Sequence, residues 1–478
     1  MFGGCRTWCY LALGAGVLTL AGCAAPHRRA GALRAAARGA NLVICVIDAA
    51  RADHVGCYGY PRDTTPNTDR LARESTIFTQ HFVQFTRTKE STASLFTSQY
   101  PDTHLAYLDR PLDPAAFTMA KGLAEAGLVT ALFSSNPNAS PALGLGRDFQ
   151  RTCYDPDIRQ VLAGSETRWS PEPLLRLFKQ WLSETSDKRF FAYLHLMPPH
   201  QPYAPPEAIT ALFKGQTPPG YRPDKYHPEK YDWPIPIEPH DKILPLPEWI
   251  NRYDANLRYA DWAVGELARI LEEAQVFENT LFIVTSDHGE AFGEHGFVWH
   301  GEPIHDEVSH VPLLIRFPHA ARTGRTDALT ESIDLLPTAF DLFRIPYPED
   351  AVQGRSLLPL MAGSAREVRP FAFTRAARHG HKYMVRDTGY ALLLWGNGRW
   401  RTLYDLQADP DQEHDVAARQ PAEMSKLLRA FEEYARKQRV PPLNFLDPNV
   451  PPPRLPPVLP TSPTPEMKKA LESLGYRD

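Results

Sequence analysis

Carboxylates and imidazoles follow three separated apolar segments of the chain. The segments and the polar residues after them are 41–47 with Asp48, 189–194 with His195 and His200, and 279–286 with Asp287 and His288. Each segment is rich in apolar residues, as is typical of a strand buried in a parallel sheet. Ligands of open α/β sheets bind beyond the carboxyl ends of the strands, so we expect these side chains to meet at one edge. Such oxygen and nitrogen ligands suit zinc or manganese better than a soft thiolate site does.

A histidine-rich segment follows the third strand. Its five histidines are His288, His295, His300, His305 and His310. A dense run of histidines beside an Asp–His pair indicates a metal or anion site. Of these five, His288 and His300 are expected to be functional. His295 is open between function and packing, whereas His305 and His310 flank a predicted strand and are expected to be packing histidines.

A candidate nucleophile, Thr88, lies just before a predicted helix at 90–98. Free N–H groups and the positive end of the helix dipole favour an anion at that position. The Thr88 hydroxyl therefore fits either helix capping or nucleophilic attack. Further polar residues are candidates for contact with an anionic substrate, with salt bridges, solvated charges or packing as the alternative: Arg51, Arg87, Lys89, Asn136 and His195.

Strand-like and helical patterns alternate over residues 41–345. This alternation predicts an α/β fold with a mostly parallel sheet covered by helices on both faces. Shorter segments joined by turns between 371 and 405, followed by a helical pattern at 421–438, predict a small antiparallel α+β subdomain within 346–440. The chain carries 52 basic and 56 acidic residues without a basic stripe, so no nucleic-acid partner is expected.

The two ends of the chain and one insertion have their own composition. Residues 1–22 predict a lipoprotein signal peptide, because Leu20-Ala21-Gly22-Cys23 is typical of a bacterial lipobox, with Cys23 as the lipidated residue. Residues 23–40 are expected to be a tether. Fourteen of the 46 prolines lie in an insertion at 198–247, and eleven more lie in a strap at 441–465 that precedes a short terminal helix within 441–478. No later run is long enough for a membrane span.

Residues 41–345 resemble the sulfatase branch of the alkaline phosphatase superfamily. The resembling stretches are NLVICVIDAARADHVGCYGYPRDTTPNTDRLA (41–72), SLFTSQYP (94–101), FFAYLHLMPPHQPYAPP (190–206), TSDHGEAFGEHGFVWHG (285–301) and HVPLLIRFP (310–318). The resemblance implies an alkaline-phosphatase-like fold and a divalent metal, which is Zn, Mn, Ca or Mg. It also implies that Asp48, Asp287 and His288 are metal ligands and that Thr88 stands at the nucleophile position. His200 and His300 are then the further catalytic candidates, which could bind the ester oxygens, hold a second metal or protonate the leaving group.

Two departures from the sulfatase pattern affect the expected chemistry. Sulfatases begin a Cys/Ser-x-Pro-x-Arg motif at the nucleophile and oxidise its first residue to formylglycine, whereas residues 88–92 here read TKEST. No formylglycine is therefore expected. Ala49 also replaces the usual second aspartate. Both features are similar to lipoteichoic-acid synthases and phosphoethanolamine transferases, whose nucleophile is an unmodified threonine and whose acidic ligands are fewer. The spacing of His195 and His200 resembles a histidine pair of the phosphoethanolamine branch.

These features favour a metal-dependent hydrolase or transferase that acts on phosphate or phosphonate esters through Thr88. The alternative is a sulfuric ester hydrolase, and a second alternative is an inactive sulfatase-like binding protein. The expected partner is an anionic ester, such as an envelope glycan or a lipid head group. The lipid anchor predicts a place in the cell envelope, on the periplasmic or extracellular face of a membrane.

Overall fold

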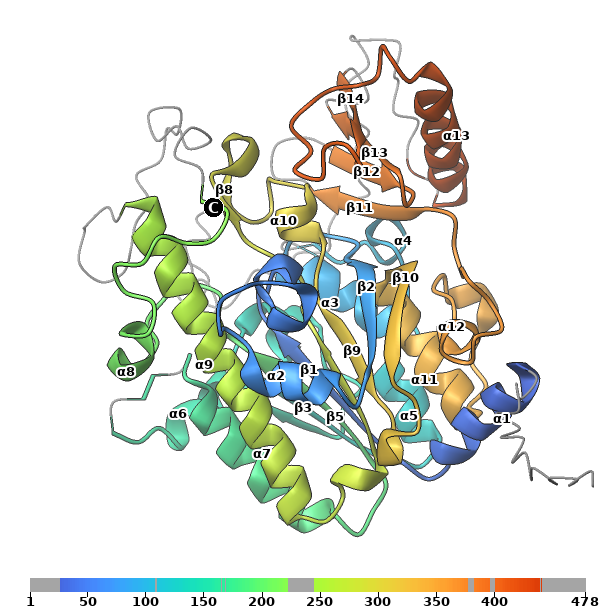
Figure 1. Ribbon diagram of the computed structural model, residues 1–478. Helices are drawn as coiled ribbons and strands as arrows, with labels where there is room; N and C mark the ends of the chain where they lie inside the picture. Colours follow the sequence, from blue (N-terminus) through green and yellow to red (C-terminus); the bar gives the residue numbers. More distant parts are fainter. Residues whose placement is uncertain are drawn as a thin grey trace, which may run out of the picture.

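The computed structural model describes residues 26–440 apart from 108–109, 165, 168, 222–244, 377–381, 396–399 and 439. Its centre is an eight-stranded sheet with the order β10-β2-β9-β6-β1-β5-β3-β4 (Figure 1). The strands are β1 (Asn41–Ile47), β2 (Thr76–Phe82), β3 (Val129–Ser134), β4 (Arg151–Cys153), β5 (Phe190–Leu196), β6 (Thr280–Thr285), β9 (Leu313–Arg316) and β10 (Gly324–Glu331). Only β9 runs antiparallel to its neighbours in this sheet, which confirms the mostly parallel sheet.

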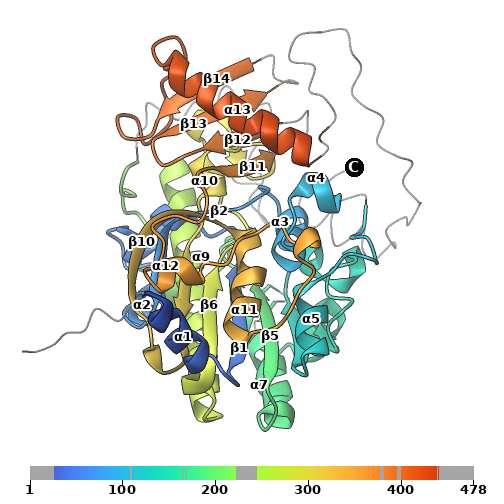
Figure 2. The ribbon, with the colours of Figure 1, turned by 90° about the vertical axis from the view of Figure 1, so that its right-hand side faces the viewer.

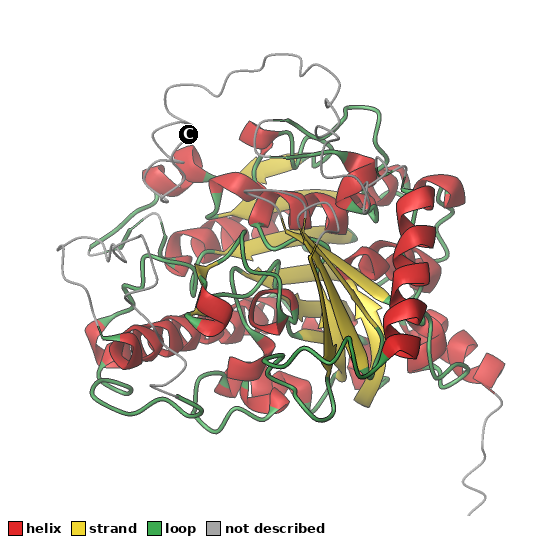
Figure 3. Ribbon diagram, turned by 90° about the horizontal axis from the view of Figure 1, so that it is seen from above, coloured by secondary structure: helices red, strands yellow, loops and turns green. Residues whose placement is uncertain are grey.

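Helices cover both faces of the sheet (Figure 3). Alternate residues of β1 belong to different hydrophobic clusters: Val43 and Cys45 face one, and Leu42 and Ile44 face the other. The first cluster is completed by α2 (Pro66–Ala72), α6 (Asp155–Gln160), α7 (Pro171–Thr185) and α9 (Leu246–Glu273). The second is completed by α1 (Pro26–Ala36), α3 (Thr88–Thr97), α5 (Met119–Glu125), α11 (Leu335–Phe343) and α12 (Leu358–Met361). This two-sided burial explains why β1 is almost continuously apolar.

The C-terminal subdomain is a second, antiparallel sheet with one helix on its face (Figure 2). Its elements are β11 (Ala372–Ala376), β12 (Lys382–Arg386), β13 (Tyr390–Trp395), β14 (Trp400–Asp405) and α13 (Pro421–Lys437). Leu427, Phe431 and Tyr434 of α13 pack on this sheet, and the antiparallel α+β arrangement that the sequence predicts is confirmed. Arg369 joins the subdomain to the large sheet, because its guanidinium pairs with the buried carboxylates of Glu331 and Asp334.

The structure corrects the expected tether at 23–40. Residues 26–36 form α1, whose Leu33 is buried in the second cluster, and Arg34 pairs with Asp341 of α11 at 2.6 Å. The sequence gives little sign of this contact because the segment consists largely of alanine and arginine, and small side chains pack closely without a strong apolar pattern. Residues 1–22, Cys23 and 441–478 lie outside the described residues, as does the 222–244 part of the proline-rich insertion.

The remaining elements are short: α4 (Pro101–His104), α8 (Glu207–Thr210), α10 (Asp306–Ser309), β7 (Ala291–Phe292) and β8 (Val298–Trp299). The structure buries Tyr253, Leu257 and Val264 along one side of the long helix α9. In the described part of the chain, no helix combines the length and the apolar character that crossing a membrane requires.

Candidate active site

The carboxyl ends of β5, β1 and β6 carry the polar residues that the sequence singles out. Asp48 follows β1, His195 is the penultimate residue of β5, and Asp287 comes two residues after β6. The three strands are neighbours, and Val46 of β1 is in register with both His195 and Thr285. The strand ends are therefore level, and their polar side chains meet at one edge as expected.

Two carboxylates and two imidazoles form the centre of this group. His195 Nε2 lies 3.0 Å from Asp48 Oδ2 and 3.7 Å from Asp287 Oδ2. His288 Nε2 lies 3.7 Å from Asp48 Oδ1 and 3.5 Å from Asp287 Oδ2. Among the described residues, Asp48 Oδ1 and Asp287 Oδ2 are buried without a hydrogen-bond partner. Buried oxygens in this state are unfavourable, so the group fits a bound cation.

The electrostatics of the group also favour a cation. Burial alone would raise the pKa of Asp48, but the imidazoles of His200, His195 and His288 outweigh it and hold that pKa well below its usual range. Burial would lower the pKa of His288, yet the carboxylates of Asp287 and Asp48 raise it. One ligand atom each from Asp48, Asp287 and His288 lies within 4.8 Å of the others. This set matches the metal ligands that the sequence predicts.

Backbone contacts fix the orientation of the group. The N–H of Ala49 points at Asp287 Oδ1 at 3.3 Å, and Ala49 has a φ of 59°, in the left-handed region. The hydroxyl of Tyr253 donates to Ala49 O at 2.8 Å. His288 Nδ1 lies 2.9 Å from Gly289 O, so this nitrogen donates and Nε2 faces the carboxylates. Ala49 thus contributes through its backbone at the place where sulfatases have a second aspartate.

Thr88 is part of the same site. Helix α3 begins at Thr88 itself, with Arg87 as the extended N-cap residue and with no side-chain cap. The expected helix start at residue 90 and the capping role for Thr88 are therefore wrong. The Thr88 hydroxyl instead lies 3.2 Å from His288 Nε2 and accepts from Asn136 Nδ2 at 3.3 Å. These tertiary contacts hold the hydroxyl beside the carboxylates, as a nucleophile requires.

His200 and His300 lie next to this centre. Their ring centroids are 4.9 Å apart, and the rings of His288 and His300 stack at 4.2 Å. His200 Nδ1 lies 2.6 Å from Gln201 O, and its buried Nε2 has no hydrogen-bond partner among the described residues. Burial and then the neighbouring imidazoles of His288 and His200 hold the pKa of His300 well below its usual range. The three imidazoles can thus contact the oxygens of one substrate.

Glu290 is a site residue to which the sequence analysis gives no role. Its Oε1 lies 2.8 Å from His300 Nδ1, and the hydroxyl of Tyr203 donates to Oε2 at 3.0 Å. Burial raises the pKa of Glu290 to about 7. Its place directly after Asp287-His288-Gly289 is visible in the sequence, but its contact with a histidine ten residues later depends on the fold of the loop.

The residues that the sequence offers for substrate contact differ in the partners that the structure gives them. Asn136 Nδ2 bridges Thr88 and Asp48, so Asn136 belongs to the site. Arg51 pairs with Asp53 and Glu294, both at 2.7 Å, and braces the loop after β6. Arg87 pairs with Glu90 at 2.6 Å. Lys89 is buried and donates to the carbonyl of Tyr107. The positive charges predicted beside Thr88 are thus largely engaged within the protein.

A sequence model of the family described as Sulfatase matches residues 40–345, more than half of the chain. The chain belongs to the sulfatase family. Residues 293–439 also match the C-terminal region described for N-sulphoglucosamine sulphohydrolase. Sulfatase family members use a divalent metal, and the unpartnered oxygens of Asp48 and Asp287 fit such an ion.

Individual relatives of this sulfatase family member include enzymes with different named activities. The N-acetylglucosamine-6-O-sulfatase of Bacteroides thetaiotaomicron is 23% identical, over 88% of this chain and 89% of that one. A solved structure in complex with its substrate D-glucosamine-2-N,6-O-disulfate has a TM-score of 0.70 at 18% identity, over 85% and 99% of the two chains. The phosphonate monoester hydrolase of Agrobacterium radiobacter has a TM-score of 0.69 at 21% identity, over 84% and 95%.

The relatives bear on the expected substrate. The sulfatase-family resemblance and the fold class are confirmed. The names of the sequence relatives favour the sulfate-ester alternative over the phosphorus-ester expectation. The roles of the individual site residues stay predictions, now with a geometry that brings Asp48, Thr88 and Asp287 together.

Proposed function

We propose that this chain is a metal-dependent ester hydrolase whose nucleophile is the unmodified hydroxyl of Thr88. The observation that supports it is the position of that hydroxyl, 3.2 Å from His288 Nε2 at the first residue of α3. A divalent ion bound by Asp48, Asp287 and His288 would lower the pKa of the hydroxyl and neutralise charge on the ester oxygens.

Other residues around Thr88 would orient its hydroxyl, bind the anionic group and protonate the leaving alcohol. Asn136 donates to Thr88 Oγ1 and orients its lone pairs. The free N–H groups at the start of α3 face the anionic group that Thr88 attacks. His200, whose buried Nε2 has no partner among the described residues, would when protonated donate to an ester oxygen or to the leaving alcohol, and the ring of His300 lies beside it. Glu290 holds the ring of His300 in position through Nδ1.

A sulfate ester of a sugar is the first candidate substrate. It is supported by the family, by the N-acetylglucosamine-6-O-sulfatase relative that aligns with most of the chain, and by the match of the C-terminal region to N-sulphoglucosamine sulphohydrolase. The buried imidazoles of His200 and His300, rather than free arginines, would meet the anion in this site.

A phosphate or phosphonate ester is the second candidate, and the nucleophile favours it. Thr88 lacks the surrounding motif that leads to formylglycine, so a sulfated Thr88 would lack the elimination step by which formylglycine releases sulfate. A phosphorylated threonine can be released by attack of water, or of a second alcohol in a transferase, because the metal stabilises most of the transferring charge. The phosphonate monoester hydrolase neighbour shows that this fold also occurs with phosphorus esters.

One panel of substrates tests the proposal and separates the candidates. Chromogenic sulfate, phosphate monoester, phosphate diester and phosphonate esters, with sulfated glucosamines, are assayed with Zn, Mn, Ca and Mg in turn. The Thr88→Val variant keeps the shape of the side chain and should lose at least about 1,000-fold in kcat/KM, whereas Thr88→Ser should keep most activity. The exposed Thr217 provides a matched control, Thr217→Val, with wild-type activity expected.

The outcomes are distinct. Turnover of a sulfate ester that Thr88→Val abolishes supports the first candidate, and turnover of a phosphorus ester alone supports the second. Turnover that persists in Thr88→Val would refute the nucleophile assignment. Absence of turnover with every ester and metal would contradict the proposal and favour the inactive binding protein.

We also propose that Cys23 carries a lipid that anchors the chain in the cell envelope, where an envelope glycan is the natural anionic partner. The support is the lipobox at residues 20–23. Detergent phase partition checks this: the wild type should enter the detergent phase, and Cys23→Ser should remain in the aqueous phase. Equal partition of the two proteins would contradict the anchor.

A further inference from the structure

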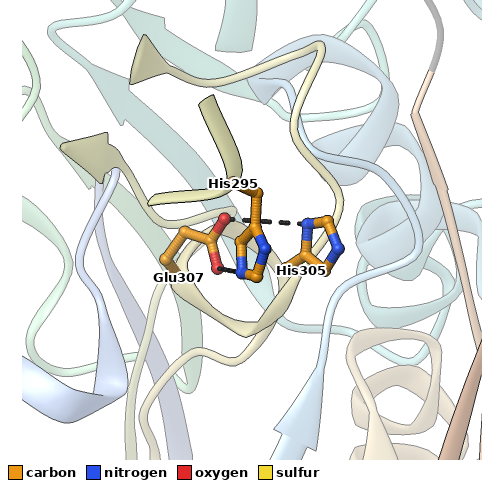
Figure 4. Close-up of side chains that lie close together, drawn as sticks. All are labelled: His295, His305 and Glu307. Atoms are coloured by element: carbon orange, nitrogen blue, oxygen red, sulfur yellow. Dashed lines mark ion pairs between the residues drawn. The ribbon is translucent and has the colours of Figure 1, made fainter. Parts of the chain in front are cut away.

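A second group of ligand-type side chains lies in the loop that follows Asp287 and His288. His295, His305 and Glu307 converge there, from the turn 294–296 and from the start of α10 (Figure 4). Glu307 Oε2 lies 3.9 Å from His295 Nε2, and Glu307 Oε1 lies 3.9 Å from His305 Nδ1. The two imidazoles stack with centroids 3.6 Å apart, so both face the same carboxylate. This group shares no residue with the group of Asp48, Asp287 and His288.

Two atoms of this second group are left without partners. His305 Nδ1 and Glu307 Oε1 are buried and have no hydrogen bond within the described part of the chain. Their separation of 3.9 Å is too long for a hydrogen bond. Burial raises the pKa of Glu307 and lowers that of His305, so a simple ion pair between them is not favoured. His305 Nδ1 and Glu307 Oε1 therefore lack a group between them that would interact with both.

A contact on the far side of His305 is compatible with a lone pair on Nδ1. His305 Nε2 lies 3.2 Å from the hydroxyl of Tyr404, on β14. With the proton of the neutral ring on Nε2, this nitrogen donates to Tyr404 and Nδ1 presents its lone pair to Glu307. Metal-binding histidines are commonly oriented by such a contact through their other ring nitrogen. The contact with Tyr404 therefore leaves His305 Nδ1 available as a ligand atom.

The donor set selects one class of ion. Two imidazole nitrogens and one carboxylate oxygen form a set that zinc binds with bonds of about 2.0–2.2 Å, so an ion between two ligand atoms spans separations up to about 4 Å. Calcium and magnesium prefer sets made of oxygen alone. The separations of 3.9 Å from Glu307 to each histidine fall within that span.

We propose that His295, His305 and Glu307 form a second metal site, specific for zinc or a similar transition-metal ion, with a fourth position open to solvent. A cavity of about 720 Å³ reaches His295 and Glu307, so water or a ligand in that cavity can occupy the fourth position. Arg51 and Glu294 line the same cavity. The ion would join the 294–296 turn to α10 and so fix the loop that carries His300.

The proposal does not depend on the reaction at Thr88. A change in the second group can nevertheless disturb the first through the backbone, because Gly289 N donates to Val308 O at 2.9 Å, directly beside His288 and Glu307. A loss of turnover would therefore not distinguish the two groups, and metal content is the readout. The full chain is prepared as the Asp287→Asn variant to weaken the first site, stripped with a chelator, and dialysed against Zn²⁺ or Co²⁺.

We expect this variant to retain about one Zn²⁺ per chain and to show the visible absorption of four-coordinate Co²⁺. Adding Glu307→Gln or His305→Gln should weaken zinc binding at least about tenfold, because a ligand is lost. His295→Gln is a second test, since its side chain is partly exposed and its replacement perturbs folding least.

The matched control is His414→Gln. His414 lies with Asp409 and Glu413 in an exposed group that also has ligand-type atoms close together. The proposal is supported if the control keeps the zinc that the Glu307 and His295 variants lose. It is overturned if the Asp287→Asn protein binds no zinc, or if its zinc is lost with His414→Gln and kept with both Glu307→Gln and His295→Gln.

Discussion

Gly289 is the position at which one added carbon atom should disturb the site most. A Cβ on this residue would lie 2.1 Å from Glu307 O and 3.0 Å from the carbonyl carbon of Glu307. Both atoms belong to the backbone, so no side-chain rotation relieves the overlap. Gly289 N also donates to Val308 O at 2.9 Å, which keeps the two segments together. The Gly289→Ala variant must therefore separate them by about 1 Å.

The expected magnitude follows from that displacement. Overpacking of this kind lowers the free energy of unfolding by about 1–3 kcal/mol. His288 is the adjacent residue, and its Nε2 lies 3.2 Å from the Thr88 hydroxyl. A shift of about 1 Å in a catalytic group lowers the rate about 100-fold, so we expect kcat/KM to fall by that factor.

The assay pairs urea unfolding with kcat/KM on the best ester of the panel. Gly31→Ala is the matched control, because Gly31 lies in helix α1 with no atom within 4 Å of an added Cβ. Alanine there should raise the free energy of unfolding by about 0.5–1 kcal/mol and leave kcat/KM unchanged. Wild-type stability together with wild-type kcat/KM in Gly289→Ala would refute the reasoning.

Three further predictions concern charge and metal. His104 is hydrogen-bonded through both ring nitrogens, and burial lowers its pKa to about 3 from 6.5. Its contribution to stability is therefore complete above pH 6.5 and is lost as the pH falls toward 3. Urea unfolding should show a loss of about 3 kcal/mol from this group by about pH 4.5, and His104→Gln should remove that loss. Arg369→Met leaves two buried carboxylates unpaired and should lower the free energy of unfolding by about 3–5 kcal/mol. Mn²⁺ at about 100 times its Kd should stabilise the chelator-treated wild type by about 2.7 kcal/mol, and Asp287→Asn should reduce this gain.

Each of these predictions has a control. His414→Gln, at an exposed position, should keep the wild-type dependence of unfolding on pH, and an unchanged dependence in His104→Gln would contradict the role of burial. Arg429→Met, on the exposed side of α13, should change stability little, and an equally small effect of Arg369→Met would contradict the buried pairing. Stabilisation by Mn²⁺ that is the same in Asp287→Asn would contradict the placement of the first metal site.

The carboxyl edge of the sheet is the part of the site that sequence reasoning predicts well. Asp48 directly follows β1 and Asp287 comes two residues after β6, and parallel strands bring such positions together whatever the loops do. The role of Thr88 cannot be predicted in the same way, because helix capping and nucleophilic attack both call for a hydroxyl residue at the start of a helix. Only the tertiary contacts with His288 and Asn136 decide between them.

Loop geometry sets the limit of sequence reasoning elsewhere. The pairing of Glu290 with His300 continues the register of the two-residue strands β7 and β8, in which Ala291 pairs with Trp299, and strands this short leave little pattern in the sequence. The stacking of His295 on His305 follows no helical or strand period. His305, expected to be a packing histidine, instead has a buried nitrogen without a partner, and this is visible only once Tyr404 of the distant β14 is placed beside it.

The packing of α1 determines how far the catalytic edge lies from an anchored N-terminus. A free tether over 23–40 would let the domain move roughly 60 Å from the bilayer, whereas α1 begins at Pro26, only about 10 Å of extended chain from Cys23. The helix leads into the start of β1, and Asp48 lies at the other end of that strand, about 20 Å away. With Cys23 lipidated as proposed, this short connection would hold the domain close to the bilayer, and a substrate would have to come within that reach of the membrane surface.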